Sequence, residues 1–390
     1  MSAELTANGA TTAAHAALAT PALAAPARVG RSTRLRAAMQ KAGLDATLVT
    51  GSAGKRYFAG FVLQQGEEWT SGYSGALIVT QESRILLADA RYTEEAMVQA
   101  PGWEVRRTRR PIGDELAAIF DTGGIRRCGA EAEVLSHADW AAIQEANPAT
   151  ELVPIDQPIR ALRLIKDVDE RAAIARACAL TDACFDHLLE AIAPPMTERE
   201  IAWEIEAWFR SHGAEAIAFE PGVLVGARAS MPHGHPSDAA LGLGDALLLD
   251  FGCQVDGYRS DMTRTIFAGE PSDEWRRLHG LVRSAQDAAY AALAVGASGT
   301  SIDAAARAVI ADAGLGEAFT HGLGHGIGLE THEEPRLLTW DRPLDTGMVF
   351  TLEPGIYLPG QIGIRIEDDV ALGADGPQRL TRSSRDVIVI

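Results

Sequence analysis

Long apolar runs, basic clusters and paired cysteines are all missing from this sequence of 390 residues. No apolar run approaches the roughly 20 residues that a membrane-spanning helix needs, so no membrane partner is expected. The formal charge of −18 argues against a nucleic-acid partner, because phosphate binding needs clustered Lys and Arg. The four cysteines form no CxxC pair and are predicted to be buried, free thiols, which suits a reducing cytoplasm. No Gly-x-Ser-x-Gly segment indicates a serine nucleophile.

The chain is too long for one ordinary core, so two domains are expected. Residues 1–28 are rich in Ala, Thr and Pro, and Glu4 is the only early charge. A secretory signal would need a basic start and a bulky apolar centre. This segment is therefore predicted to be a poorly ordered tail.

Residues 29–158 are predicted to form an α/β domain, because short apolar runs alternate with helical patterns. The predicted strands are residues 46–49, 76–79, 85–88, 105–107 and 152–153. The predicted helices are residues 32–41, 91–99, 112–120 and 137–145, and Gly43 is expected to cap the first of them.

Residues 159–390 have a different pattern, in which helices are followed by hairpins. The predicted helices are residues 167–192, 197–213, 273–295 and 301–313. The second of them begins with a capping box, in which Thr197 and Glu200 satisfy each other's backbone amides. Long helices interleaved with hairpins indicate an α+β domain.

Two carboxylates are predicted to meet on one face of a hairpin. An apolar run ends at Asp250, and an Asp256-Gly257 turn separates it from a strand that contains Asp261. If this dipeptide is the loop, Asp250 lies opposite Thr263, and Asp261 shares the same face. A turn shifted by one residue would place the two acids directly opposite. A solvated pair of surface acids is the alternative, and it fits poorly with so apolar a run.

The pattern recurs nearer the carboxyl terminus. A second apolar run ends at Glu353, residues 359–361 supply a turn signal, and the returning segment carries Glu367. With a three-residue loop, Glu353 lies opposite Glu367, and Arg365 shares the face of Glu367. Like charges this close are costly without a cation. Two such hairpins around one centre therefore predict a metal site.

A glycine-rich segment between the hairpins supplies histidines. In residues 321–329 glycine occupies every second position, which disfavours a helix, and no strand–turn–helix context supports a dinucleotide-binding loop. In an extended form one face carries only hydrogen, so another backbone can approach closely. The other face presents His321 and His325 together, which we interpret as a functional pair.

Four carboxylates and an imidazole suit divalent ions such as manganese, cobalt, iron or zinc. Four negative charges balance two divalent ions, so two ions per chain are predicted, with manganese the expected metal. Two such ions can share and activate a water molecule, which would attack a carbonyl without a serine or cysteine nucleophile. The residues therefore predict a metal-dependent hydrolase.

The motifs resemble the pita-bread-fold metallopeptidases, in particular the Xaa-Pro dipeptidases (prolidases) and Xaa-Pro aminopeptidases. The resemblance is carried by residues 250–252, 260–265, 321–328, 351–355 and 363–369, all at the family's spacing. More loosely, residues 55–99 resemble the creatinase-like amino-terminal domain. The resemblance implies an α+β pita-bread catalytic domain at 159–390, preceded by a creatinase-like α/β domain at 29–158. It also implies a homodimer in which the leading domain helps to close the active site.

The resemblance assigns a role to each candidate site residue. Asp250 would bind one metal, His325 and Glu353 the other, and Asp261 and Glu367 would bridge them. The implied catalytic residues are His233 beside the substrate and the water, His332 at the peptide carbonyl or in proton transfer, and Arg365 beside the bridging carboxylates. His321 and Tyr357 would line the substrate pocket. His235 is interpreted as a loop residue.

The implied activity is hydrolysis of the Xaa-Pro bond at the amino terminus of a short peptide, with dipeptides favoured. A Xaa-Pro aminopeptidase that accepts longer peptides is the first alternative. A non-peptidase hydrolase or lyase of the same fold is another, because fold does not dictate substrate. A non-catalytic binding module is the last, and the intact set of five ligands argues against it.

Overall fold

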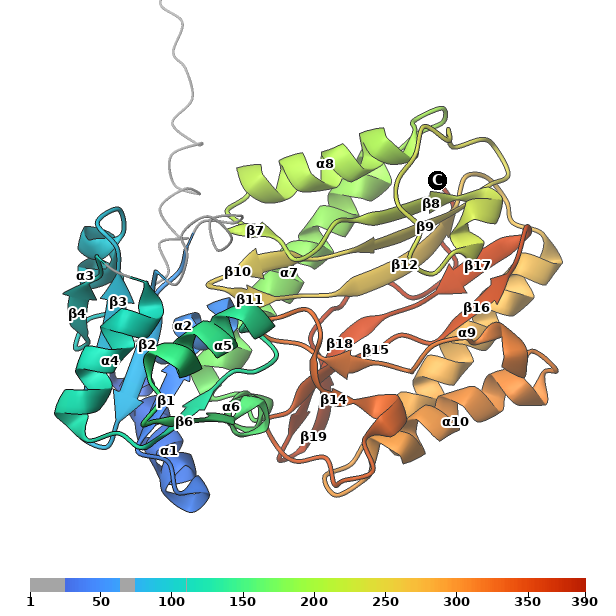
Figure 1. The fold of residues 1–390 in the computed structure, drawn as a ribbon. Helices are drawn as coiled ribbons and strands as arrows, with labels where there is room; N and C mark the ends of the chain where they lie inside the picture. Colours follow the sequence, from blue (N-terminus) through green and yellow to red (C-terminus); the bar gives the residue numbers. More distant parts are fainter. Residues whose placement is uncertain (1–24, 64–73, 110) are drawn as a thin grey trace, which may run out of the picture.

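The structure is a computed structural model that describes residues 25–63, 74–109 and 111–390. An amino-terminal α/β part is followed by a larger part in which several small sheets lie between helices (Figure 1). Residues 1–24, most of the predicted tail, lie outside the described residues, and residue 25 already begins a helix. Across these described ranges, no helix combines the length and the apolar content that crossing a membrane requires.

The amino-terminal part contains one mixed sheet with the strand order β4-β3-β2-β1-β5-β6. Its strands are β1 (Ala46–Val49), β2 (Ala76–Thr80), β3 (Arg84–Ala88), β4 (Glu104–Arg107), β5 (Arg127–Ala130) and β6 (Glu151–Pro154). Five of the six were predicted. The sequence prediction missed β5 because Arg-Cys-Gly-Ala contains no β-branched or aromatic residue. It is nevertheless a central strand, paired in parallel with both β1 and β6.

Helices cover both faces of this sheet. On one face are α4 (Ile112–Gly123) and α5 (His137–Ala146). On the other are α1 (Ala25–Ala42), α2 (Ser52–Ala59), α3 (Thr93–Gln99) and α6 (Asp156–Leu164). The predictions for α1, α3, α4 and α5 are confirmed, whereas α2 and α6 were missed. Pro158 lies in the first turn of α6, where a proline is tolerated.

Four long helices flank the strands of the second part. They are α7 (Val168–Ala191), α8 (Glu198–Ser211), α9 (Asp273–Ala292) and α10 (Gly299–Asp312), and all four were predicted. Both α7 and α8 begin with capping boxes, including the predicted one at Thr197 and Glu200. The strands lie between the pair α7–α8 and the pair α9–α10, and each pair packs its own apolar cluster against them (Figure 1).

The strands of the second part form small antiparallel groups. They are ordered β11-β10-β7, β12-β9-β8, β14-β13-β15-β18-β19 and β16-β17. Their bounds are β7 (Ala216–Ile217), β8 (Gly222–Val225), β9 (Ala246–Phe251), β10 (Cys253–Val255), β11 (Tyr258–Arg259), β12 (Met262–Phe267), β13 (His325–Gly326), β14 (Glu333–Arg336), β15 (Val349–Leu352), β16 (Gly355–Leu358), β17 (Ile362–Arg365), β18 (Asp368–Gly373) and β19 (Gly376–Arg379).

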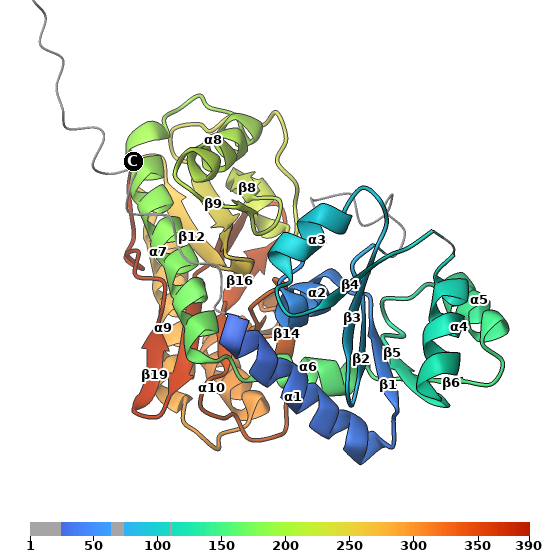
Figure 2. The ribbon, with the colours of Figure 1, turned by 90° about the vertical axis from the view of Figure 1, so that its left-hand side faces the viewer.

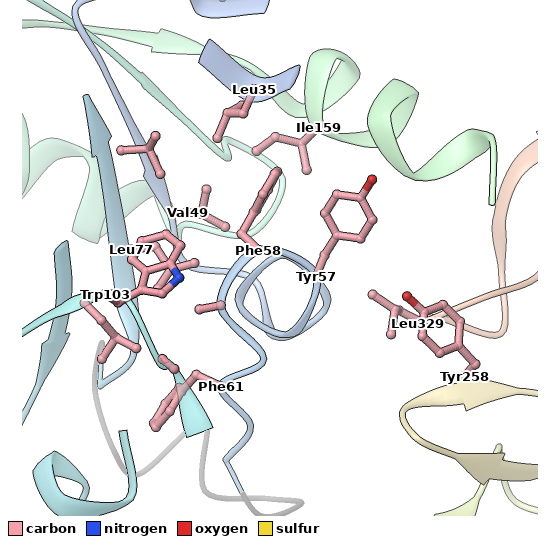
Figure 3. Packing of buried hydrophobic residues seen from close by; sticks show 14 of the residues in the cluster. Leu35, Val49, Tyr57, Phe58, Phe61, Leu77, Trp103, Ile159, Tyr258 and Leu329 are labelled. Atoms are coloured by element: carbon pink, nitrogen blue, oxygen red, sulfur yellow. The ribbon is translucent and has the colours of Figure 1, made fainter. Parts of the chain in front are cut away.

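The two parts share one apolar cluster. Figure 2 shows α1 and α6 at the junction, between the sheet of the first part and α7 of the second. In the close view of Figure 3, Tyr57 lies between Leu35 and Ile159 of the first part and Tyr258 and Leu329 of the second. All five side chains are buried. The junction is therefore a continuous core and holds the two parts in a fixed arrangement.

Candidate metal centre

The first carboxylate hairpin folds in the register that its turn predicts. Asp256 (φ 50°) and Gly257 (φ 83°) form the loop, and positive φ at both positions is the hairpin geometry that matches strand twist. Asp250 consequently pairs with Thr263. Asp261 lies two residues before Thr263, on the face of Asp250. The alternative register, with the two acids directly opposite, is wrong.

The second carboxylate pair lies where two ladders join. Strands β16 and β17 pair in the register that a three-residue loop requires. Strands β15 and β18 continue the same register, with Leu352 opposite Asp368. Glu353 and Glu367 lie at the junction, at positions that the common register places opposite each other.

His325 comes from the glycine-rich segment, which is extended only over His325–Gly326 (β13). The close approach of other backbone is confirmed. A Cβ at Gly324 would lie 2.0 Å from the carbonyl oxygen of Thr351, and one at Gly326 would lie 2.1 Å from that of Glu334. The glycines thus allow the segment to press against its neighbours and bring His325 to the carboxylates.

The ligand-type side chains converge from these three segments. One oxygen or nitrogen each of Asp261, His325 and Glu367 lies within 4.8 Å of the others, and all three residues are buried. The Nε2 atom of His325 is 3.3 Å from Oε1 of Glu353 and 3.8 Å from Oδ2 of Asp261. Asp250 lines the same cavity, whose volume is about 600 Å³. The five predicted ligands therefore meet in one place.

Electrostatics indicate that this centre needs added positive charge. Burial raises the pKa of Asp261 and Glu353 well above their usual ranges, and the charge of Glu367 adds to the effect on both. Burial and the charge of Asp250 raise the pKa of Glu367 to about 7. Carboxyl groups in this arrangement ionise together only if cations compensate them.

The hydrogen bonds prepare His325 for metal binding. Burial lowers its pKa to about 3, so the imidazole is neutral. Its Nδ1 atom lies 3.1 Å from the carbonyl oxygen of Gly326, which can only accept, so Nδ1 carries the proton. The lone pair is therefore on Nε2, the atom that faces the carboxylates.

The donor set fits divalent ions. Oδ1 of Asp250 and Oδ1 of Asp261 are buried without a hydrogen-bond partner among the described residues, and unsatisfied buried acceptors are rare without a ligand. The remaining carboxylates are oriented by hydroxyls: Thr263 donates to Glu367 over 2.6 Å, and Thr351 donates to Glu353 over 3.2 Å. Oriented oxygens plus one imidazole suit hard or borderline cations.

Arg365 connects the carboxylates to the pocket wall. Its guanidinium bonds a carboxylate oxygen of Asp250 and donates to the hydroxyl of Thr263 over 2.9 Å and to that of Tyr357 over 2.8 Å. The hydroxyl of Tyr357 lies 2.9 Å from Nε2 of His321. Burial and the charge of Arg365 lower the pKa of His321 to about 4. The structure thus brings these three predicted residues into one hydrogen-bonded chain.

The two remaining predicted histidines lie on loops around the cavity. His233 and His332 both line it, and the rings of His332 and His325 are 4.2 Å apart. Burial and the charge of Arg336 lower the pKa of His332. The side chain of His235 is 80% exposed, and it lies 3.2 Å from Glu220 rather than in the cavity.

Sequence analysis missed Arg336, which also lines the cavity. It ends β14, where its backbone pairs with His325. No carboxylate in the described part of the chain lies within 4.0 Å of its guanidinium. A single arginine in a polar segment gives no signal in a sequence, so only the fold could identify it.

A second cavity of about 620 Å³ adjoins the first. Phe219, Thr331 and His332 line both cavities. The far wall of the second cavity is formed by residues 51–54 at the start of α2 and by Ile159, Arg160 and Arg163 of α6. The candidate site is therefore open towards the amino-terminal part.

Two family models match the chain. The model described as "Metallopeptidase family M24" matches residues 172–374. The model described as "Creatinase/Prolidase N-terminal domain" matches residues 31–165. The first match covers the carboxylate hairpins and the glycine-rich segment, and the second covers the six-stranded sheet.

Relatives match over almost the whole chain. The Xaa-Pro dipeptidase of Pyrococcus horikoshii is 33% identical over 351 residues, which is 90% of this chain and 96% of the relative. The solved structure of an Xaa-Pro dipeptidase from Bacillus anthracis matches with a TM-score of 0.88 and 36% identity, over 93% of this chain and all of that chain. The crystal structure of an X-Pro aminopeptidase from Thermotoga maritima matches with a TM-score of 0.84 and 36% identity, over 92% of this chain and all of that chain.

Proposed function

We propose that this chain, which belongs to metallopeptidase family M24 and combines a creatinase-like amino-terminal domain with a pita-bread catalytic domain, hydrolyses the Xaa-Pro bond at the amino terminus of short peptides. A metal-dependent peptidase is the activity of the family. The observation that carries the finer proposal is the cavity of about 600 Å³ in which all five ligand-type residues meet histidine and arginine side chains.

Two divalent ions would be held by the five residues. These residues are Asp250, Asp261, His325, Glu353 and Glu367, which all line the same cavity. Bound divalent ions supply Lewis acidity, which polarises the peptide carbonyl and lowers the pKa of water. Manganese as the metal, a homodimer and a cytoplasmic location stay predictions.

The protein's own groups would orient the substrate and move protons. His332, with its lowered pKa, is neutral near pH 7 and can donate its N–H to the scissile carbonyl, or relay a proton to the leaving nitrogen by accepting one at one ring nitrogen and releasing one from the other. His233 lines the same cavity and would act beside it. Arg365 holds Asp250 in place, so its role is to fix the carboxylate rather than to react.

The proline preference rests on the chemistry of the bond. The nitrogen of an Xaa-Pro bond has no hydrogen, so the site needs no acceptor for an amide proton. The ring of His321 lines the cavity, and its hydrogen bond with the buried hydroxyl of Tyr357 holds it as a rigid wall against which a proline ring can lie.

Dipeptides are favoured because of Arg336. In a dipeptide the terminal carboxylate belongs to the proline itself and lies directly beyond the scissile bond. A cavity-lining guanidinium with no carboxylate within 4.0 Å among the described residues is suited to bind it. The second cavity favours the alternative, a Xaa-Pro aminopeptidase, because it offers space for a longer peptide.

A matched substrate set tests the proposal. We expect Met-Pro to be cleaved faster than Met-Pro-Ala, and both much faster than Met-Ala and acetyl-Met-Pro. Faster turnover of Met-Pro-Ala would favour the aminopeptidase, and equal turnover of Met-Ala would refute the proline preference. Exhaustive dialysis against a chelator should abolish cleavage, and full activity after it would refute the metal site.

A further inference from the structure

The segment of residues 328–333, here called the histidine loop, separates the two cavities. Thr331 and His332 line both of them, whereas Leu329 at the start of the loop packs in the apolar cluster that the two parts share. In the described part of the chain no side chain or backbone group forms a hydrogen bond with the imidazole of His332, which is exposed. The position of this imidazole therefore depends on the backbone that carries it.

Both ends of the histidine loop are held by one arginine. Arg163, in the last turn of α6, donates from Nη2 to Oε2 of Glu330 over 2.6 Å and also to Oε1 of Glu333. Lys166, just after α6, lies with Nζ 3.2 Å from Oε2 of Glu333. The loop thus spans from one carboxylate to the other, with His332 between them.

The contacts of Glu333 with Arg163 and Lys166 are buried and charged. The side chains of Arg163, Lys166 and Glu333 are 9%, 1% and 6% exposed. Burial opposes ionisation of Glu333, but the charges of Lys166 and Arg163 lower its pKa to about 2. The pairs therefore do not switch off in the pH range of a peptidase, and removing one partner would leave a buried charge uncompensated.

The other contacts of the histidine loop involve its two ends and Thr331. Glu333 begins β14, and the ladder with β13 fixes the chain from that residue onwards. At the other end, the amide of Glu330 donates to Oε1 of Glu333 over 3.1 Å, the same oxygen that accepts a hydrogen bond from Arg163. Thr331 accepts a hydrogen bond from Arg259 over 3.1 Å and donates one to the carbonyl oxygen of Ala218 over 3.3 Å. His332 has no anchor of its own.

We propose that Arg163 and Lys166, in the connection between the two domains, are positioning residues for His332. They hold Glu330 and Glu333 on either side of it and thereby set the place of the imidazole over the scissile bond. The connecting helix is in this way part of the active-site architecture, although it touches no substrate. The inference rests on the catalytic role proposed for His332.

A double-mutant cycle with the dipeptide substrate tests the inference. Arg163→Met should lower kcat by about 10- to 100-fold, because a displacement of about 1 Å costs that much, while KM and metal content stay within about 2-fold. In a His332→Ala background the same change should have almost no further effect on kcat, because the group that it positions is gone. Arg106→Met is the control: it also removes an arginine charge from the amino-terminal domain, but its partner is Glu104 and it lines neither cavity.

Glu330→Gln is a second variant that tests the inference even if the Arg163→Met protein does not fold. The carboxylate of Glu330 is 56% exposed, so its loss strands no deeply buried charge, and kcat should fall by about 3- to 10-fold. Wild-type kcat in both Arg163→Met and Glu330→Gln would overturn the inference, and so would an equal loss in the presence and absence of His332. If His332→Ala alone keeps wild-type kcat, the proposed role of His332 has failed instead.

Discussion

The side chain of Glu367 makes several contacts in the candidate metal centre. It accepts a hydrogen bond from Thr263 over 2.6 Å, lies 3.9 Å from Nε of Arg365 and belongs to the buried group with Asp261 and His325. Its raised pKa, about 7, reflects burial and the charge of Asp250. A carboxylate that is buried beside other negative charges is stabilised most by a cation that it shares with its neighbours.

We therefore predict that Glu367→Ala abolishes peptidase activity. Outer-shell changes already cost about 10- to 100-fold, so loss of a proposed direct ligand should cost more than about 100-fold. Metal content per chain, measured after dialysis, should fall, and excess metal should not restore the rate. Glu270→Ala, on an exposed carboxylate, is the control. A Glu367→Ala protein with full metal content and rate would contradict the assignment.

His279 gives a residue-scale prediction outside the active site. It is 2% exposed on α9, and burial, reinforced by the charge of Arg283, lowers its pKa from 6.5 to about 4. The folded pKa is below the unfolded one, so the unfolded chain takes up the proton first as the pH falls. The contribution of His279 to stability should therefore decrease between about pH 6.5 and pH 4 and level off below that window.

The change attributable to His279 should be about 3 kcal/mol across that window. Urea unfolding of wild type and His279→Gln at several pH values measures it, because the variant should show a shallower decline. His235→Gln, with a side chain that is 80% exposed, should keep the wild-type slope. Parallel curves for wild type and His279→Gln would contradict the prediction.

At the scale of elements, glycines decide how closely strands approach. A Cβ at Gly324 would lie 2.0 Å from the carbonyl oxygen of Thr351 and 2.9 Å from its hydroxyl. That hydroxyl orients Glu353 and accepts the backbone N–H of His325 over 3.2 Å. The spacing of β13 and β15 and the position of two candidate ligands therefore depend on the absence of a Cβ atom at Gly324.

Gly324→Ala should destabilise the protein by about 3 kcal/mol or more, because overpacking against backbone cannot be relieved by a rotamer change. It should also lower metal content by displacing His325. Gly280→Ala is the matched control, since a Cβ there meets no atom within 4 Å and the residue lies inside α9. That change should stabilise by about 0.5–1 kcal/mol. Equal urea midpoints for the two variants would refute the argument.

How far the sequence predicts these elements depends on local signals. The Asp256-Gly257 turn and the apolar run before Asp250 are local, so the first hairpin and its register were predictable. Strand β5 and helix α2 were not, because their residues have weak propensities and only tertiary packing selects their structure. The predicted histidine pair was correct in position, but the segment is extended over only two residues.

The site was predictable only as far as its motifs reach. Ligand-type residues can be recognised in the sequence by their type and spacing. Arg336 cannot, because it is one arginine among many and reaches the cavity only through the pairing of β14 with β13. Arg163 contacts the histidine loop through Glu330 and Glu333, which are 167 and 170 positions further along the sequence. No local pattern encodes contacts of that range.

At the scale of the whole molecule, a buried polar cluster joins the two domains. Arg31 of α1 is fully buried. Its guanidinium donates to Oδ2 of Asp167 over 2.9 Å and to the carbonyl oxygen of Tyr57 over 3.1 Å. Glu170 lies 3.5 Å from Arg31 and accepts from the hydroxyl of Tyr258 over 2.9 Å. Residues from the first helix, the start of α7 and the first hairpin thus share one charge centre.

This cluster and the common apolar core predict that the two domains unfold as one cooperative unit. Wild type should show a single transition in calorimetry and in urea. Arg31→Met should cost about 3–5 kcal/mol, because it leaves Glu170 buried without its cation. Arg106→Met is the control: its pair with Glu104 is 44% and 55% exposed, so its loss should cost less than about 1 kcal/mol. Two separate wild-type transitions, or an Arg31→Met variant as stable as Arg106→Met, would show that the domains are coupled by neither feature.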